Sequence, residues 1–166
     1  MKKFLSLEPI AVLSISCSSD DNDDESVAGI YTLTEFSVSN PQDLNGDGVA
    51  STDMLSETVC LDDAFLQLYA DNTFTASGEG IDISLDSEGN PQISCMDDGN
   101  YSGTYEVSGN TVTMSYTSDG EVYTDQFEIN NNSISYTVED GAAVGVDNNG
   151  NPVFITTDIT IVYTKQ

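Results

Sequence analysis

The chain of 166 residues contains no histidine, no arginine and no tryptophan, and it sets only three lysines against 29 acidic residues. Without histidine, neither a Ser-His-Asp relay nor an imidazole metal site can form. Without arginine, there is no bidentate clamp for a phosphate or a carboxylate. Two carboxylates would suffice for glycoside hydrolysis, but no pair among so many acids stands out. The sequence therefore predicts a protein that is not an enzyme.

The charge balance also limits the partners. The formal net charge is −26 at pH 7, and a field of this sign repels nucleic acid and anionic membrane surfaces. Self-repulsion keeps such a chain soluble, and we expect a monomer. The length suggests one domain that can bury a proper core.

The first residues, MKKFLSLEPIAVLSISC, combine a lysine pair, an apolar stretch and small residues before Cys17. This is the shape of a bacterial signal peptide, and it resembles a lipoprotein signal, in which the cysteine becomes the lipidated first residue. The alternative is a buried first strand, AVLSIS. We expect a signal peptide over residues 1–16, lipidation at Cys17 and contact with the membrane through this lipid anchor.

The polar and acidic run that follows, CSSDDNDDES, cannot pack in a core and predicts a disordered tether over residues 17–26. An acidic run directly after a lipidated cysteine resembles the export tag of surface lipoproteins in some Gram-negative bacteria. The predicted location is therefore the outer membrane or the cell surface.

Two further cysteines, Cys60 and Cys95, lie in the body of the chain. Export would place them in an oxidising space, where a disulfide persists. Two cysteines without histidine are too few ligands for zinc, which leaves a pair of buried free thiols as the alternative. We expect a Cys60–Cys95 disulfide, which would stabilise the fold by about 3–4 kcal/mol in the chain-entropy model.

From Gly29 onward, short segments of alternating apolar and polar residues are separated by Gly, Asn and Asp turns. The segment TVTMSYT, for example, places Val112, Met114 and Tyr116 on one face. Turns recur about every ten residues, which predicts an all-β antiparallel meander of about eight strands, closed as a barrel or folded as a β-sandwich. The expected strands lie near residues 29–38, 61–70, 73–84, 101–107, 111–117, 121–129, 133–139 and 153–164, and we expect irregular segments at 39–58 and 77–99.

Three segments resemble the lipocalin-like domains of bacterial lipoproteins: GIYTLTEF, LQLYADNTFTASG and YSGTYEVSGNTVTM. Tyr31 and Tyr105 stand where such domains usually have tryptophan, and Asn72 stands where glycine is usual. Together the segments cover most of residues 27–165. The resemblance implies a lipocalin-like domain over residues 27–166, an eight-stranded calycin-type barrel on a lipid tether with no defined catalytic residues.

The segment DLNGDGVASTD resembles the start of a calcium loop, with acidic or amide side chains at positions 1, 3 and 5 and Gly48 at position 6. Position 12 is Met54 rather than an acid, so a nearby carboxylate would have to complete the site. The candidate calcium ligands are Asp43, Asn45, Asp47, the Val49 carbonyl, Asp53 and Glu57. The alternative is a polar surface turn in which Asp43 caps local amides.

Two functions from different classes follow. The leading hypothesis is a lipid-anchored, non-enzymatic lipocalin-like envelope protein that binds a small apolar ligand inside the barrel. Inward-facing Tyr, Phe, Ile and Met residues would line the pocket without a charged anchor; the alternative is that they fill a solid core. The second hypothesis is a calcium-stabilised surface adhesion or assembly module that contacts a glycan or a protein, through Tyr69, Tyr101 and Tyr123 if these face outward.

Overall fold

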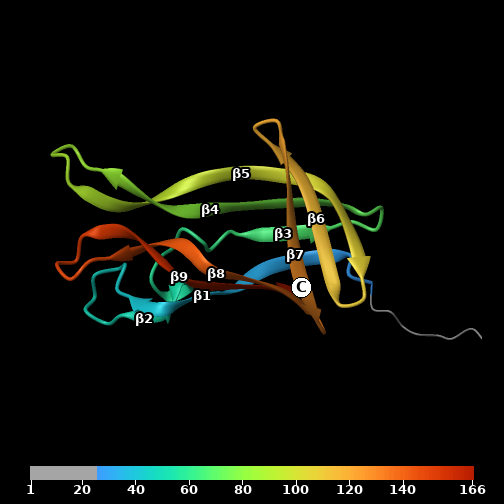
Figure 1. The fold of residues 1–166 in the computed structure, drawn as a ribbon, viewed down its shortest axis with the longest axis horizontal. Coiled ribbons are helices and arrows are strands. Elements are labelled where there is room, and N and C mark those ends of the chain that lie inside the picture. Colours follow the sequence, from blue (N-terminus) through green and yellow to red (C-terminus); the bar gives the residue numbers. More distant parts are fainter. Residues whose placement is uncertain (1–25) are drawn as a thin grey trace, which may run out of the picture.

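The computed structural model describes residues 26–166, except for the side chains of Glu79 and Asp98. The predicted signal peptide, Cys17 and all of the predicted tether except Ser26 lie outside the described residues. The described part consists of strands and one short 3-10 helix, η1 (Met54–Ser56). The strands are β1 (Gly29–Gln42), β2 (Ser51–Asp53), β3 (Phe65–Leu68), β4 (Thr73–Leu85), β5 (Pro91–Ser108), β6 (Thr111–Ser118), β7 (Glu121–Asn130), β8 (Ser133–Val146) and β9 (Pro152–Lys165) (Figure 1).

Eight of these strands close into an antiparallel barrel. Consecutive strands pair from β3 to β9, and β1 pairs with β3 and with β9. Tyr31, for example, stands opposite both Leu66 and Lys165. The three-residue β2 is a short addition that pairs with β1 at Ser37 and Gln42. Closure removes the free sheet edges that a sandwich would keep, and it confirms the predicted barrel.

Three strands are longer than the sequence predicts. β1 continues to Gln42 instead of ending near residue 38. β5 begins at Pro91, and the segment expected to be irregular forms a hairpin in which Leu85 pairs with Pro91. β8 continues to Val146 past an irregularity between Val138 and Gly141. The β5 extension is rich in Ser, Asp, Asn and Gly, and none of its described residues is buried, so its sequence shows no alternation of apolar and polar residues. In β8, the irregularity between Val138 and Gly141 interrupts the alternation, although Gly141 and Val144 beyond it are buried. The predicted irregular segment at 77–99 and the predicted end of β8 were therefore wrong.

The larger core cluster fills one part of the barrel with eight buried residues: Tyr31, Leu66, Leu68, Phe74, Tyr105, Val112, Met114 and Ile134. Its two tyrosines occupy the positions where the resemblance has tryptophan. Their hydroxyls donate hydrogen bonds to backbone carbonyls, Tyr31 to Val27 and Tyr105 to Tyr69, each at 2.7 Å. A buried phenol needs such a partner, and both positions supply one close to the end of a strand. A smaller cluster, Val38, Met54, Leu61 and Ile159, fills a second part of the interior.

Candidate ligand-binding site

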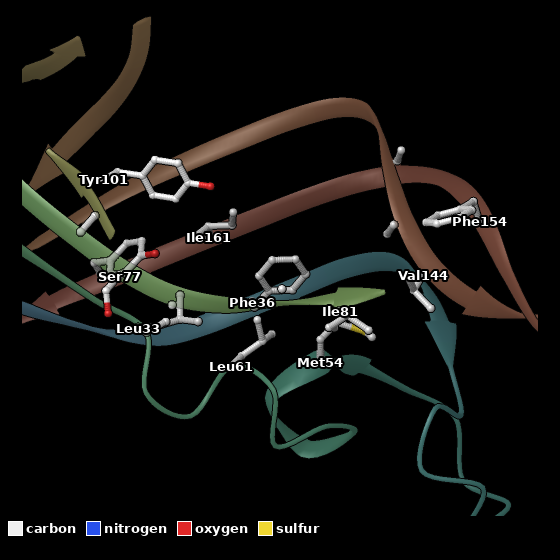
Figure 2. A pocket seen from close by; sticks show the side chains of 17 residues that line it. Leu33, Phe36, Met54, Leu61, Ser77, Ile81, Tyr101, Val144, Phe154 and Ile161 are labelled. Atoms are coloured by element: carbon white, nitrogen blue, oxygen red, sulfur yellow. The ribbon is translucent and has the colours of Figure 1, made fainter. Parts of the chain in front are cut away.

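A cavity of about 330 Å³ lies among the strands of the barrel, and the 65% exposed Phe154 in its lining shows that it opens to solvent. Residues from β1, β4, β5, β8 and β9 and from the segment around η1 line it. Figure 2 shows Phe36 in the middle of the view, with Met54 and Leu61 beneath it and Tyr101 and Phe154 toward opposite ends. The volume is at the lower end of the range of small-molecule pockets.

Small side chains create this cavity. Seven of the 17 lining residues are glycine, alanine or serine: Ala64, Ala76, Ser77, Gly78, Gly80, Ala142 and Ala143. Most of them come from β4 and β8, where larger side chains would fill the interior. The remaining lining is apolar or aromatic and none of it is charged, as the sequence predicts. The hydroxyls of Ser77, Tyr101 and Tyr163 are its polar side-chain groups.

A second cavity of about 110 Å³ adjoins the first, and the two share Ala76, Tyr101 and Tyr163 as lining residues. Its other walls come from the larger core cluster and from β6 and β7: Leu66, Phe74, Met114, Tyr116, Asp125 and Phe127. We call it the inner subsite. The two cavities together offer a larger space without a charged lining residue and a smaller one that contains Asp125.

Asp125 is a charged residue at the inner subsite, and the prediction of a pocket without a charged anchor is wrong in this respect. β7 pairs with β6 so that Asp125 stands opposite the buried Met114, and Tyr123 stands opposite Tyr116. This register puts Asp125 on the inner face with Phe127. The alternation of Tyr123, Asp125 and Phe127 contains this signal, but an acid in an acid-rich chain is normally assigned to the solvent face.

Aromatic residues line the same subsite as the Asp125 carboxylate. The ring centroids of Tyr101 and Tyr116 lie 5.6 Å apart in an edge-on arrangement, and Tyr116 stacks on Tyr123 at 5.6 Å. Burial raises the pKa of the Tyr116 hydroxyl to about 12, and the charge of Asp125 and a hydrogen bond to its carboxylate contribute to this shift. Burial also raises the pKa of the Tyr163 hydroxyl, where the two cavities adjoin. Both phenols therefore remain neutral at physiological pH.

The three predicted contact tyrosines do not form one outer surface. Tyr101 lines both cavities, so its proposed outward role is wrong. Tyr123 stacks on Tyr116 beside the inner subsite, although 44% of its surface stays exposed. Tyr69 is 37% exposed, and its hydroxyl lies 3.4 Å from the Thr75 hydroxyl. The adhesion hypothesis therefore loses Tyr101 from its contact surface.

The predicted calcium loop is an ordered polar turn. The Asp43 carboxylate accepts hydrogen bonds from the backbone N–H groups of Asp47 at 3.1 Å and Gly48 at 2.9 Å. The Asn45 side-chain oxygen accepts from the Asp47 N–H, and Asp47 Oδ1 accepts from the Val49 N–H at 2.8 Å. These bonds are those expected of the alternative interpretation, in which the side chains cap local amides.

Glu57 and Asp53, the two candidates for completing a calcium shell, accept hydrogen bonds from different segments. Glu57 is buried, and its Oε2 accepts the Leu44 N–H at 3.0 Å, which places this carboxylate at the loop. Asp53 instead caps η1 by accepting the Leu55 N–H at 3.1 Å. Across residues 26–166, no group of three or more His, Cys, Asp or Glu side chains is arranged to hold a metal ion. Calcium binding stays a prediction.

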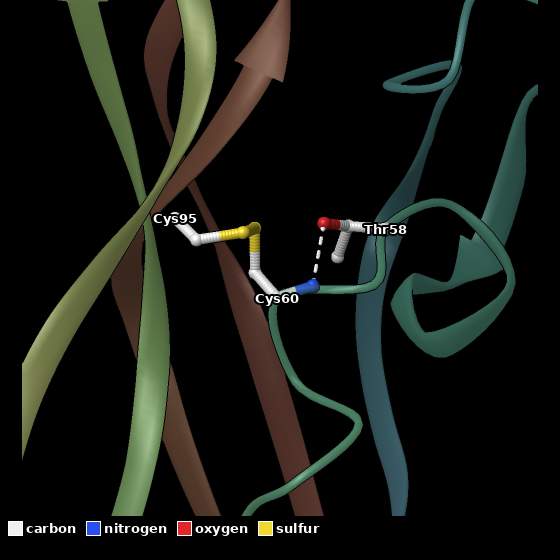
Figure 3. Close-up of a disulfide and its surroundings, with 3 residues drawn as sticks. All are labelled: Thr58, Cys60 and Cys95. Atoms are coloured by element: carbon white, nitrogen blue, oxygen red, sulfur yellow. Dashed lines mark hydrogen bonds between the residues drawn. A yellow bond between two sulfur atoms is a disulfide. The ribbon is translucent and has the colours of Figure 1, made fainter.

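The disulfide is confirmed. Cys60 and Cys95 are joined with a Cα–Cα distance of 5.1 Å, and Figure 3 shows the bond linking the segment after η1 to β5. The Cys60 N–H also donates to the Thr58 hydroxyl at 3.1 Å. This segment carries Leu61, which lines the larger cavity, so the bond holds one cavity wall against the barrel.

A closed barrel of eight antiparallel strands around an apolar cavity is the architecture of a lipocalin-type barrel. The chain matches the model of the lipocalin-like domain family over residues 27–136, more than half of its 166 residues, and it belongs to that family. The match ends within β8, while the barrel closes through β9. Proteins of this family are generally non-enzymatic.

Neither the curated proteins nor the solved structures include a match to this chain. Within residues 26–166, the structure contains no helix with the length and apolar character needed to cross a membrane.

Proposed function

We propose that this protein binds a small, largely apolar molecule inside its barrel. The observation that carries the proposal is the cavity of about 330 Å³, whose lining contains no charged side chain. An apolar molecule that enters it leaves water for an apolar environment, which is the main source of affinity in such pockets. The hydroxyls of Ser77, Tyr101 and Tyr163 can orient a polar group on that molecule.

We also propose that a lipid on Cys17 anchors the barrel at the bacterial envelope, at the outer membrane or the cell surface. The support is the sequence: a basic start, an apolar stretch ending in Cys17, and an acidic run after it. Mass spectrometry of the mature N-terminus tests this proposal. Acyl chains on Cys17 would support it, and a mature chain that begins elsewhere would contradict it.

Filling the cavity tests the binding function. Ala143 lines the cavity on β8, and Ala143→Phe would place a ring in the open space. The fluorescence of N-phenylnaphthylamine, a neutral apolar probe, should rise saturably with the unaltered protein. The variant should bind it at least about tenfold more weakly, a difference of about 1.4 kcal/mol.

Thr137→Phe is the matched control, because Thr137 lies on the same strand with its side chain exposed. This variant should bind the probe like the unaltered protein. Melting temperatures of both variants show whether the new ring has overpacked the interior. If the unaltered protein shows no saturable binding, or if Ala143→Phe binds as well as Thr137→Phe does, the cavity is not a ligand site.

A further inference from the structure

The inner subsite has the charge and the aromatic surroundings of a site for an organic cation. Asp125 is the one charged residue among the described residues that line either cavity. The single basic residue within residues 26–166 is Lys165, whose ammonium group donates to the Ser26 carbonyl at 2.6 Å. No basic side chain of the described chain is therefore paired with Asp125, and a cation from outside would supply the missing positive charge.

The aromatic rings of the inner subsite indicate which class of cation fits there. Tyr101, Tyr116 and Phe127 line the same subsite as Asp125, and Tyr123 stacks on Tyr116. Aromatic faces attract cations through the ring quadrupole, and they also accept the apolar substituents of an ammonium group. A carboxylate among several rings therefore suits an organic ammonium ion better than a strongly hydrated metal ion.

The volumes of the two adjoining cavities indicate the shape of a ligand that carries this cation. The inner subsite offers about 110 Å³ and the adjoining cavity about 330 Å³, and Tyr101 and Tyr163 line both. The small volume is suited to a head group and the large, uncharged volume to an apolar tail. The strong negative field of the whole chain also raises the local concentration of cations and repels fatty acid anions.

We propose that the natural ligand is a cationic amphiphile, with its ammonium group beside Asp125 and its apolar tail in the larger cavity. This inference rests on the proposed function and adds the chemical class of the ligand. Asp125 selects the ligand by charge, while the larger cavity accepts apolar tails whatever their head group.

Three linear ligands of ten carbon atoms each test the selection by charge: decylamine, decanol and decanoate, measured by isothermal titration calorimetry below their micelle concentrations. The unaltered protein should bind decylamine most tightly, decanol about tenfold more weakly, and decanoate most weakly. Asp125→Asn keeps the side-chain shape and removes the charge. This variant should bind decylamine about tenfold more weakly than the unaltered protein, and its affinity for decanol should be unchanged.

Glu128→Gln is the matched control, since Glu128 lies on the same strand with its side chain exposed and the change removes the same formal charge. It should leave the affinity for decylamine unchanged. Equal weakening by Asp125→Asn and Glu128→Gln would mean that the overall field attracts the amine, which overturns the inference. The comparison of the three ligands on the unaltered protein does not depend on the variants folding.

The outcomes separate this inference from the proposed function. If decylamine and decanol bind the unaltered protein equally, the barrel binds apolar molecules but Asp125 does not select cations, and only the inference fails. If none of the three ligands binds and N-phenylnaphthylamine also fails to bind, the proposed function fails and the inference fails with it.

Discussion

At the scale of single residues, Tyr116 lies where the core meets the inner subsite. Its ring contacts the edge of Phe74, with centroids 6.4 Å apart and planes at 89°. Gly103 stands opposite it on β5, and a Cβ there would collide with the Ser115 carbonyl and come within 2.9 Å of the Phe74 ring. A glycine at this position therefore lets the strands approach and the two rings pack.

The raised pKa of Tyr116 predicts a loss of stability at alkaline pH. Its phenol loses the proton at a pKa of about 12 in the folded protein, against 10.0 for the ordinary group. Between these values, only the unfolded chain releases the proton, so stability falls as the pH rises from 10.0 toward about 12. Below pH 10.0 the contribution is fully present. Tyr116→Phe should make the alkaline loss of melting temperature shallower.

Absorbance titration of tyrosinate provides the direct measurement. Burial also raises the pKa values of Tyr105 and Tyr163, so part of the alkaline loss should remain in Tyr116→Phe. Asp125→Asn should lower the pKa of Tyr116, because the carboxylate charge is one of the causes of the shift. An unchanged titration in both variants would mean that this tyrosine is not in the environment described.

At the scale of elements, two long hairpins share one turn sequence, D-x-x-G-N-P, at Asp86–Pro91 and Asp147–Pro152. In each turn, the Asp N–H donates to the carbonyl of the Asn four residues later at 2.9 Å, and the Gly has a positive φ. The Asn N–H in turn donates to the carboxylate of the Asp, again at 2.9 Å, which holds the pKa of both Asp residues below the ordinary value. These hairpins, β4–β5 and β8–β9, carry most of the small residues of the cavity.

The loop that contains Asp43 and Asp47 is the element on which the calcium prediction rests. Calcium should raise the melting temperature saturably if it binds there, because a ligand of the folded state stabilises by mass action. Asp47→Asn keeps a side-chain oxygen for the Val49 N–H but removes the charge, and this variant should lose the calcium effect.

Asp63→Ala is the control for the calcium experiment, since this exposed acid lies outside the loop. It should respond to calcium as the unaltered protein does. Sodium at matched ionic strength measures general screening of the acidic surface. If calcium raises the melting temperature of Asp47→Asn as much as that of Asp63→Ala, the segment is a polar turn only.

At the scale of the whole molecule, the disulfide connects the segment outside the strand meander to the barrel. The bond joins residues 35 positions apart, so its loss should cost about 3–4 kcal/mol of unfolding free energy in the chain-entropy model. Changing both Cys60 and Cys95 to Ser should lower the unfolding midpoint in denaturant accordingly. It should also weaken binding in the larger cavity, because Met54 and Leu61 on the tethered segment line it.

Reduction of the unaltered protein is the control for the double variant, and both should show the same loss of stability. A shift of the midpoint without any change in ligand affinity would mean that the segment keeps its place without the bond. No shift at all would contradict a stabilising role for the disulfide.

The local pattern of the sequence determined most of the strands and turns, because alternation with period two and Gly, Asn and Asp turns act over a few residues. Segments such as Thr111–Ser118 therefore appear where the pattern predicts them. The pattern left a barrel and a sandwich open, and the resemblance to lipocalin-like domains favoured the barrel. The Cys60–Cys95 disulfide could also be predicted from the sequence, because only two cysteines remained once Cys17 had been assigned to a lipid. The position of Glu57 at the acidic loop agrees with its candidate role, although what that loop binds is still a prediction.

Only the tertiary structure decided whether the interior is hollow and what it contains. A cavity depends on which small residues of β4 and β8 face it together, and these strands are far apart in the sequence. In the same way, Asp125 faces inward because the register of β7 on β6 places it opposite Met114. Its neighbours Tyr101 and Tyr116 come from other strands. Closure of the barrel brings these residues into one site, because contacts between distant strands exist only after the sheet has formed.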